Sequence, residues 1–374
     1  MRVLLLNYEF PPLGGGAGNA TYHLLEELIN KNGLEIDLVT SSSGVFHKKI
    51  FSKNITGHFL DINKKEENFH HQSIKDLLIY FLKAFFYSRN LLKQKNYDLI
   101  HAFFGVPCGL IALLLNKPYI VSLRGSDVPY FNQRFYWIDR LFIKRLSRQV
   151  WKKSAAVIAN SQGLKELALK TALNQKIMII PNGTDTDFFR PGKAKKQNAI
   201  LFVGRLIQRK GIDLLIRAFS RLPRSFKEGY ELWVAGDGPQ KEKLLKLAAE
   251  LKVEKNIKIM GRKSRQEVKK MFQQAKLFVL PSYNEGMSNA LLQALASGLP
   301  VIFTNTGGSA ELVDKDNGIT VNKGSIKELV TAMEQILGNE NRQKSMGIAS
   351  RQKSEKMSWK KMVQGYQKIY QFYA

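Results

Sequence analysis

Cysteine and long apolar runs are both nearly missing from this 374-residue chain. Its single cysteine, Cys108, excludes an internal disulfide framework and any metal site built from several cysteines. No apolar run reaches the roughly 18 residues that a membrane-spanning helix needs. The opening MRVLLLNYEFPP has one arginine and a short apolar run, which is typical of a first buried strand and not of a signal peptide. These absences predict a cytoplasmic protein.

Acidic residues are also scarce, because 31 aspartates and glutamates face 58 lysines and arginines and leave a net charge of +27. Such a balance favours anionic partners: phosphates, nucleic acid or an acidic membrane face. Generally solvated lysines are the alternative reading. The positive charge recurs along helices instead of forming one tail, and no recognised nucleic-acid reader motif is present, so nucleic acid is not expected as a partner. No cluster with metal-ligand spacing is present, so no metal and no cofactor are expected.

The most informative segment is the stretch 281–312. A buried strand at 277–280 leads into a loop carrying Glu285, a helix at 288–296 ends before Gly298, and a second strand follows at 300–304. Ligands of such βαβ units lie at the carboxyl ends of the strands. Helix-start amides bind phosphate, and a carboxylate accepts hydrogen bonds from sugar hydroxyls. This segment therefore predicts a site for a phosphorylated, hydroxyl-rich ligand.

Two further strand ends carry phosphate-binding features. The strand at 3–7 precedes the glycine-rich residues 14–18 and a helix at 20–31, but neither the glycine spacing nor the end of the next strand fits a dinucleotide-binding turn. The strand at 199–203 ends in Gly204-Arg205, and Lys210 follows five positions later. An arginine fork and a lysine at this spacing can surround a diphosphate from two sides.

For two helical segments, the sequence does not decide between packing within the domain and contact with a membrane surface. The segment 73–92 is apolar around most of a helix, so it is either sandwiched in the domain, which we favour, or meets a membrane on one side. The segment 134–153 is basic, with Lys144, Arg148 and Lys152 sharing one helix face beside an apolar stripe. A basic amphipathic helix suits an anionic interface, and an ordinary surface helix packed on a sheet has the same pattern.

Three groups in the first half are candidates for a second side of the site. His101 lies near the end of the strand at 99–103, where a structural role tied to the backbone is favoured over a catalytic one. The strand at 119–123 leads into Arg124-Gly125-Ser126-Asp127. Arginine cannot act as a base near neutral pH, but it can bind an anionic acceptor or a donor phosphate.

The turn-rich run 181–192 predicts a domain boundary near 183–195.

These motifs, in order, resemble those of family 4 retaining glycosyltransferases. The resemblance rests on the pair Gly15-Gly16, the loop at Arg124–Asp127, the Pro181-Asn182-Gly183 turn, Gly204-Arg205 with Lys210-Gly211, and the run from Glu285 to Ile302. Two positions depart from the family pattern. Gln293 stands where the family has a second glutamate, and Arg124 stands where it commonly has histidine.

The resemblance implies a GT-B fold, in which two Rossmann-like α/β domains face a cleft. The implied domains are residues 1–183 on the acceptor side, 184–357 for nucleotide-sugar binding, and a last helix at 358–374 that crosses back to the first. Glu285, Arg205 and Lys210 would be catalytic. The donor-binding residues would be Gly15, Gly16, Gly204, Gly261, Arg262, Gly286, Met287, Ser288, Asn289 and Gln293; His101, Arg124 and Asp127 would lie on the acceptor or sugar side.

The implied activity is a metal-independent, retaining hexosyl transfer from a nucleotide-diphosphate sugar to a saccharide or lipid-linked acceptor, in the synthesis of cell-surface polysaccharide, lipopolysaccharide or glycolipid. With the basic helix, it also implies a cytoplasmic enzyme held peripherally at the anionic inner face of the cell membrane. The alternative is a catalytically weakened nucleotide-sugar-binding subunit of a glycosylation complex, which Gln293 and Arg124 suggest.

Overall fold

The computed structural model describes residues 1–64, 73–131, 143–193 and 195–373, and these divide into two compact units. Unit 1 comprises Met1–Asn182 together with Trp359–Ala374, and unit 2 comprises Gly183–Ser358. Each unit has its own sheet and its own buried apolar core. The chain first passes from unit 1 to unit 2 inside the Pro181-Asn182-Gly183 turn.

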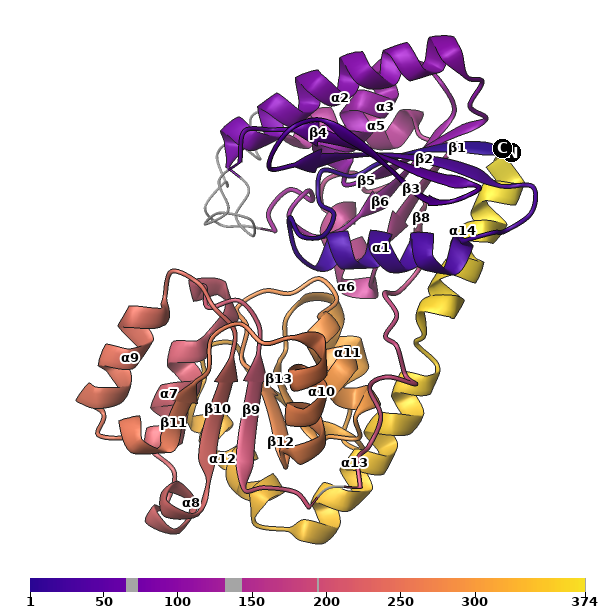
Figure 1. Cartoon of the computed structure of the whole chain (residues 1–374). Coiled ribbons are helices and arrows are strands. Elements are labelled where there is room, and N and C mark those ends of the chain that lie inside the picture. Colours follow the sequence, from indigo (N-terminus) through magenta and orange to yellow (C-terminus); the bar gives the residue numbers. More distant parts are fainter. Residues whose placement is uncertain (65–72, 132–142, 194, 374) are drawn as a thin grey trace. The chain divides into compact units, whose positions relative to one another are not determined.

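Unit 1 is built on an eight-stranded sheet in the order β3-β4-β2-β1-β5-β6-β7-β8 (Figure 1). All neighbours run parallel except β3 and β4, which form an antiparallel hairpin at one edge. The strands are β1 (Arg2–Leu6), β2 (Glu35–Ser42), β3 (His47–Ser52), β4 (Ile55–Asp61), β5 (Leu99–Phe103), β6 (Tyr119–Leu123), β7 (Ala156–Ala159) and β8 (Ile177–Ile179). The central strands are apolar along their length and buried on both faces, as in parallel sheets covered by helices.

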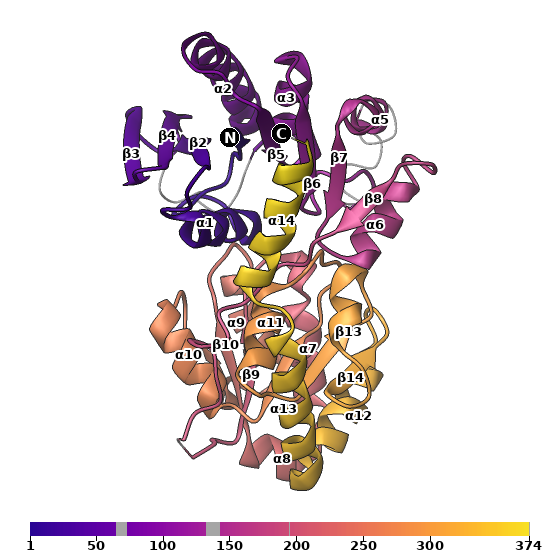
Figure 2. The same cartoon turned by 90° about the vertical axis from the view of Figure 1, so that its right-hand side faces the viewer.

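Helices cover both faces of this sheet. Figure 2 shows one layer on each side. One layer holds α1 (Gly16–Leu28), α6 (Gln162–Leu169) and α14 (Trp359–Tyr373); the other holds α2 (Ile74–Gln94), α3 (Leu110–Leu114) and α5 (Lys144–Lys153). A π-helical turn, η2 (Gly105–Gly109), joins β5 to α3. The last helix packs on α1, where the ring of Trp359 stacks on His23 at 4.6 Å between centroids.

Unit 2 has a six-stranded, fully parallel sheet in the order β11-β10-β9-β12-β13-β14. Its strands are β9 (Ala199–Val203), β10 (Glu231–Ala235), β11 (Ile257–Ile259), β12 (Leu277–Leu280), β13 (Val301–Thr304) and β14 (Gly318–Val321). Numbered from β9, the order is 3-2-1-4-5-6: the first three strands are added toward one edge of the sheet and the last three toward the other, so the order switches between β9 and β12. Ligands of doubly wound folds bind at this switch point, outside the carboxyl ends of the strands.

The helices of unit 2 follow from capped, amphipathic segments. They are α7 (Ile212–Ser220), α8 (Arg224–Gly229), α9 (Lys241–Glu250), α10 (Arg265–Gln274), α11 (Asn289–Ala296), α12 (Ile326–Leu337) and α13 (Glu340–Glu355), with short 3-10 turns η5 (Gln208–Lys210), η6 (Glu254–Asn256) and η7 (Gly307–Leu312). The Ser264 hydroxyl accepts from the Glu267 amide and the Glu267 carboxylate accepts from the Ser264 amide, a capping box that starts α10. In the chain, α7 packs with α9 and α12, and α11 packs with α13.

The structure corrects three local expectations. The first helix begins at Gly16, not at 20, because the Glu9 carboxylate accepts from the Gly15 amide and Gly15 becomes the N-cap. The hairpin β3–β4 has no counterpart among the expected elements, and its first strand, His47–Ser52, is exposed at four of its six residues and half-buried at the other two. The helix at 73–92 is not buried all round, because one side of α2 faces out.

Candidate functional site: strand-end loops of unit 2

Four strand-end loops of unit 2 meet at the switch point, and glycines allow them to approach. A Cβ on Gly211 would lie 2.1 Å from the Pro281 carbonyl oxygen, which brings the loop after β9 against the loop after β12. A Cβ on Gly307 would lie 1.8 Å from the Glu285 carbonyl oxygen, which adds the loop after β13. The loop after β10 joins them, since a Cβ on Gly236 would lie 1.8 Å from the Gly204 oxygen. Only glycine permits these contacts.

Glu285 lies at the centre of these loops and is only 6% exposed. Its Oε1 accepts from Lys210 Nζ at 2.5 Å and from Ser282 Oγ at 2.7 Å. Arg209 is 3.6 Å from Oε2 and also donates to the Asn284 carbonyl at 2.6 Å. The carboxylate predicted at the end of β12 is thus held by a cation predicted at the end of β9.

The electrostatics of this cluster follow from one acid held by two cations, Lys210 and Arg209, with the charge of Arg205 acting on Lys210. Burial by itself raises the pKa of Glu285, but the charges of Lys210 and Arg209 and the hydrogen bonds to its carboxylate hold that pKa below its usual value. Burial, with the like charges of Arg209 and Arg205, lowers the pKa of Lys210 against the opposing effect of Glu285. One ionised carboxylate beside an excess of positive charge suits a ligand with hydroxyls and phosphates.

The helix start beside Glu285 is formed as expected, one residue later. The Ser288 hydroxyl accepts from the Leu291 amide at 3.4 Å and caps α11, and Gly298 ends that helix with φ +69°. Met287 and Ser288 are buried next to this start. Gln293 lies one turn further on and is half-buried. Gly286, Met287, Ser288 and Asn289 therefore stand between Glu285 and the first turn of α11.

The other donor-side residues of unit 2 lie on neighbouring loops. Gly204 follows β9, and its amide donates to the Ala235 oxygen at 3.0 Å. Gly261 follows β11 with φ +67°, and its oxygen accepts from the Gly236 amide at 2.8 Å. Arg262 is exposed at the edge of these loops. The structure thus places the donor-side candidates of this unit along one edge of the sheet.

Sequence reasoning missed Ser282, Arg209 and Gly307. Arg209 precedes Lys210 in a basic run, and that run was the available signal. Ser282 carries no signal in the sequence, because its hydroxyl matters only through the fold of the loop. Gly307 was missed because its contact with the Glu285 backbone exists only when the loop after β13 lies against the loop after β12.

Candidate functional site: strand-end loops of unit 1

The glycine loop of unit 1 is organised by Glu9. The Glu9 carboxylate accepts from the Gly15 amide at 3.0 Å, and a Cβ on Gly14 would lie 2.5 Å from the Glu9 side chain. Gly15 and Gly16 form the first turn of α1 after β1, as a phosphate-approaching loop requires. Glu9 is a further residue that the motif did not reveal.

His101 is part of the core of unit 1. It is 0% exposed, and its two ring nitrogens hydrogen-bond with the Tyr370 hydroxyl at 2.6 Å and the Ser122 hydroxyl at 2.7 Å. Burial, with the charge of Arg124, lowers its pKa well below the usual value, so the ring is neutral. With no exposed surface, His101 presents nothing to an acceptor, and its place as an acceptor-side residue is corrected to a structural one.

Arg124 and Asp127 shape the loop after β6. The Asp127 carboxylate accepts from the amides of Gly105, Arg124 and Gly125 at 2.7–2.9 Å. Burial raises the pKa of Asp127 while these amides oppose the rise. The Arg124 guanidinium donates to Asn182 Oδ1 at 2.9 Å and lies 4.3 Å from the centre of the Phe103 ring. Both side chains thus have roles within unit 1.

The basic segment 134–153 is described only from residue 143. In the described part, Val150 and Trp151 of α5 are fully buried, and Arg148 donates to the Thr171 carbonyl. This part packs on unit 1 like an ordinary surface helix. The remainder of that amphipathic stripe lies outside the described residues.

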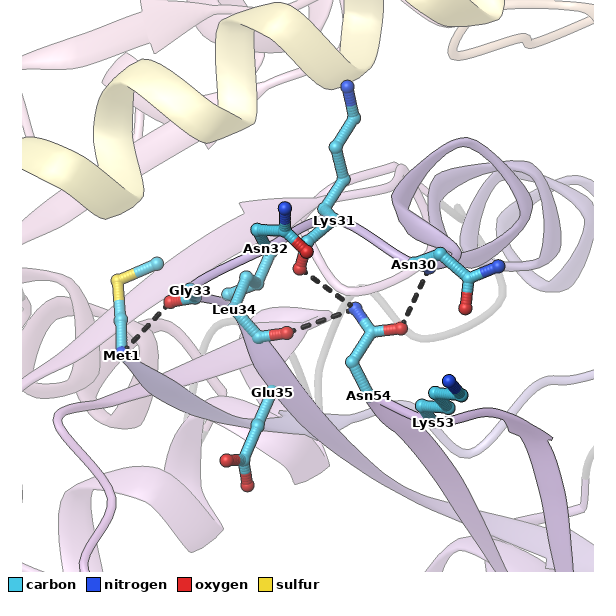
Figure 3. Close-up of a pocket in the computed structure, with 9 residues that line it drawn as sticks. All are labelled: Met1, Asn30, Lys31, Asn32, Gly33, Leu34, Glu35, Lys53 and Asn54. Carbon is cyan, nitrogen blue, oxygen red and sulfur yellow. Dashed lines mark hydrogen bonds between the residues drawn. The ribbon is translucent and has the colours of Figure 1, made fainter.

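A polar hollow of about 480 Å³ lies at the opposite end of this sheet, beside the amino ends of β1 and β2. Figure 3 shows Asn54 at its centre. The Asn54 amide donates to the carbonyls of Leu28, Lys31 and Leu34, and its oxygen accepts from the Asn30 amide. Because these groups close loops and lie away from the ligand edge, this hollow is not a candidate site.

Among the described residues, no group of three or more histidine, cysteine or acidic side chains is placed to hold a metal ion. None of the described helices combines the length and the apolar character needed to cross a membrane.

Comparison with known proteins matches each half of the chain to a glycosyltransferase family model. Residues 14–188 match the family model described as Glycosyltransferase Family 4, and residues 183–353 match that described as Glycosyl transferases group 1. An uncharacterized glycosyltransferase of Methanocaldococcus jannaschii is 29% identical over 99% of this chain and 98% of its own length. The lipopolysaccharide core biosynthesis glycosyltransferase LpsE of Rhizobium meliloti is 28% identical over 58% of this chain and 64% of its own.

Solved structures show the same fold. Sucrose-phosphate synthase from Thermosynechococcus elongatus superposes with a TM-score of 0.85 at 19% identity, covering 99% of this chain and 98% of that one. HepE of Anabaena, in complex with UDP-glucose, gives a TM-score of 0.77 at 17% identity and covers 99% of both chains. The expected GT-B class of two parallel-sheet α/β domains is confirmed.

Proposed function

Because the chain belongs to the group 1, family 4 glycosyltransferases, we propose that it transfers a hexose, with retention of anomeric configuration, from a nucleoside-diphosphate sugar to a saccharide or lipid-linked acceptor. The observation that carries the proposal is the Glu285–Lys210 pair at the switch point of unit 2. The neighbour HepE was solved with UDP-glucose, which supports a donor of this class.

The chemistry assigned to the cluster is electrostatic. Arg205 and Lys210, joined by Arg209, would stabilise the negative charge that gathers on the departing diphosphate, and the first amides of α11 would share that charge. Glu285, kept ionised by its neighbours, would accept hydrogen bonds from hydroxyls of the transferred sugar. In this proposal the protein's own cations stabilise the departing diphosphate, and no metal is assigned to the step.

The cellular part of the proposal is synthesis of surface polysaccharide, lipopolysaccharide or glycolipid at the cytoplasmic face of the membrane. Its support is the likeness to the lipopolysaccharide core enzyme LpsE and the net charge of +27, which favours an anionic surface.

A donor screen tests the proposal most directly. The full chain is titrated with UDP- and GDP-sugars, and hydrolysis and transfer are followed for each. We expect one nucleotide sugar to bind and to be hydrolysed slowly without acceptor, and to be consumed faster with it. Absence of binding to every such donor would overturn the proposal. Proton NMR of the product's anomeric signal then decides between retention and inversion.

A second candidate function is a catalytically weakened binding subunit. Gln293 favours it, because an uncharged amide stands where the carboxylate of the family's glutamate would make a charge-assisted hydrogen bond to the ribose. The same screen separates the two. A subunit of this kind binds a nucleotide sugar but neither hydrolyses nor transfers it, whereas an enzyme does both.

A further inference from the structure

Helix α2 presents a continuous apolar stripe to the outside of unit 1. Ile74, Leu78, Leu82 and Phe86 recur every four residues and are 53–62% exposed. The opposite side of α2 carries Tyr80, Ala84 and Leu91 into the core, so the helix is apolar on both sides. Both views show α2 at the outside of unit 1, where one side of the helix packs on β2 and β4 and the other faces out (Figure 1, Figure 2).

The stripe continues onto a second element. The loop before β3 carries Val45, which is 87% exposed, and Phe46, whose ring lies 5.4 Å from that of Tyr87 on α2. Between loop and helix runs a groove of about 530 Å³, and Leu82 and Phe86 line its other side. Elsewhere in the described chain, exposed apolar residues are mostly scattered, such as Leu245 and Ile348 in unit 2. A gathered patch of this kind marks an interaction surface.

The charges around the stripe are mainly positive. On α2 itself Lys75, Lys83, Arg89 and Lys93 are exposed, whereas the helix's one acid, Asp76, is bonded to Lys64 Nζ and the Ser73 amide. Lys48 and Lys49 follow Phe46 on strand β3 and are exposed. Asp61 lines the groove, and one of its carboxylate oxygens accepts a hydrogen bond from the Asn63 amide. The patch therefore joins an apolar strip to cationic flanks.

We propose that this patch, formed by Val45, Phe46, Ile74, Leu78, Leu82 and Phe86 with their lysine flanks, docks unit 1 onto an anionic phospholipid bilayer. An amphipathic helix lying along a membrane inserts apolar side chains below the headgroups, while flanking lysines and arginines meet the anionic headgroups. A second copy of the chain is a poorer occupant, because a twofold contact would set the same lysines against each other.

This surface deepens the membrane part of the proposed function and rests on it. It places the contact on the 43–46 loop and on one side of α2, a segment for which the sequence left membrane contact open, and it does not involve any residue of the nucleotide-sugar cluster.

The test is co-sedimentation of the full chain with vesicles of phosphatidylcholine alone, or of equal parts phosphatidylcholine and phosphatidylglycerol. The apolar variant is Leu78→Gln, Leu82→Gln, Phe86→Gln, in which glutamine keeps a helix propensity close to that of leucine. The matched control is Leu245→Gln, Ile348→Gln, which removes exposed apolar residues from helices of unit 2. A charge variant, Lys75→Gln with Lys83→Gln, completes the set.

We expect the wild type and the control to bind the phosphatidylglycerol vesicles. The apolar variant should lose at least about tenfold in partition coefficient, and the charge variant should fall toward the level seen with phosphatidylcholine alone. Sedimentation of the apolar variant equal to wild type would overturn the proposal. So would a wild-type dimer in size exclusion that becomes a monomer in the apolar variant, since a second copy would then be the occupant.

Donor hydrolysis in vesicle-free buffer separates this inference from the enzymatic one. The apolar variant should bind and hydrolyse the donor as the wild type does, with an unchanged circular dichroism spectrum. If the wild type sediments with anionic vesicles but binds no nucleotide sugar, the enzymatic proposal fails and the docking surface stands.

Discussion

At the scale of single residues, the arrangement around Glu285 decides what the cluster can do. The Glu285 carboxylate faces Lys210 and Arg209, and the charge of Arg205 acts on Lys210, so removal of the carboxylate leaves an excess of positive charge and not an uncompensated anion. The cations are therefore available to phosphate whether or not the acid is charged. Binding of the nucleotide and handling of the sugar become separable by substitution.

Glu285→Gln should lower the turnover of the donor by at least about 100-fold, because the neutral amide is a weaker acceptor for the sugar hydroxyls than the charged carboxylate. Binding of UDP alone should change by less than about threefold, since the amide does not repel phosphate. Single-turnover kinetics and calorimetric titration of UDP measure the two effects. Glu231→Gln, a surface acid paired with Lys258, is the control. Full turnover in the Glu285 variant would show that this side chain is not at the reacting sugar.

Gln293→Glu tests the departure from the family pattern. If the side chain faces the ribose, the new carboxylate restores a charge-assisted hydrogen bond, and the Kd of the donor should fall by about fivefold. Calorimetry with the donor identified in the screen gives the value. The reverse result, a weaker donor, would mean that phosphate rather than ribose lies beside this position.

At the scale of elements, strand-end loops hold the site, and glycine permits their contact. Gly307→Ala places a methyl group 1.8 Å from the Glu285 oxygen at φ +54°, so the loop after β12 must move. Gly324→Ala is the matched control, because Gly324 also has a positive φ, +78°, but has open space around its Cβ position. The control should cost about 1 kcal/mol of strain, and Gly307→Ala more, with loss of donor turnover. Urea unfolding measures the loss of stability, and donor hydrolysis measures the loss of turnover. Equal stability and equal turnover in the two variants would show that Gly307 does not shape the site.

Much of this element-level picture could be predicted from the sequence. The strand, helix and second strand within 277–304 predicted a βαβ unit, whereas the two α/β domains and the loops that carry the donor-side residues were implied by the family resemblance. Ser282 and Glu9 could not be predicted, because their carboxylate and amide partners come together only through loop geometry. The outer stripe of α2 was only one of two open alternatives for another reason: a helix that is apolar on all sides does not tell which side the sheet covers.

At the scale of the whole molecule, two cores are built on separate sheets, and unit 1 is assembled from both ends of the chain. Its last helix carries Tyr366 and Tyr370 into a network with His101 and Ser122. Each unit therefore has its own polar groups whose ionisation affects its stability, and the two need not respond to pH together.

Asp37 gives unit 1 a distinct acid sensitivity. Its buried carboxylate bonds with His58 at 2.8 Å, Tyr97 at 2.7 Å and Lys95 at 3.1 Å. Burial by itself raises the pKa of Asp37, but these hydrogen bonds and the Lys95 charge lower it to about 2. Because the folded pKa lies below the unfolded one, the stabilisation is complete above about pH 4 and is lost as the pH falls toward 2. It amounts to about 2 kcal/mol.

Asp37→Asn should therefore lower the stability of unit 1 by at least about 2 kcal/mol at pH 7, with a smaller difference from wild type near pH 3. Hydrogen-exchange mass spectrometry of the full chain in urea follows peptides of each unit separately. Peptides from β2 and β4 should lose protection at lower urea in the variant, whereas those from β9 and β12 should not change. Glu27→Gln, an exposed acid on α1, is the control. A loss of stability that is the same at both pH values would assign the effect to packing and not to the charge of Asp37, and equal loss in both units would show that the two cores unfold as one.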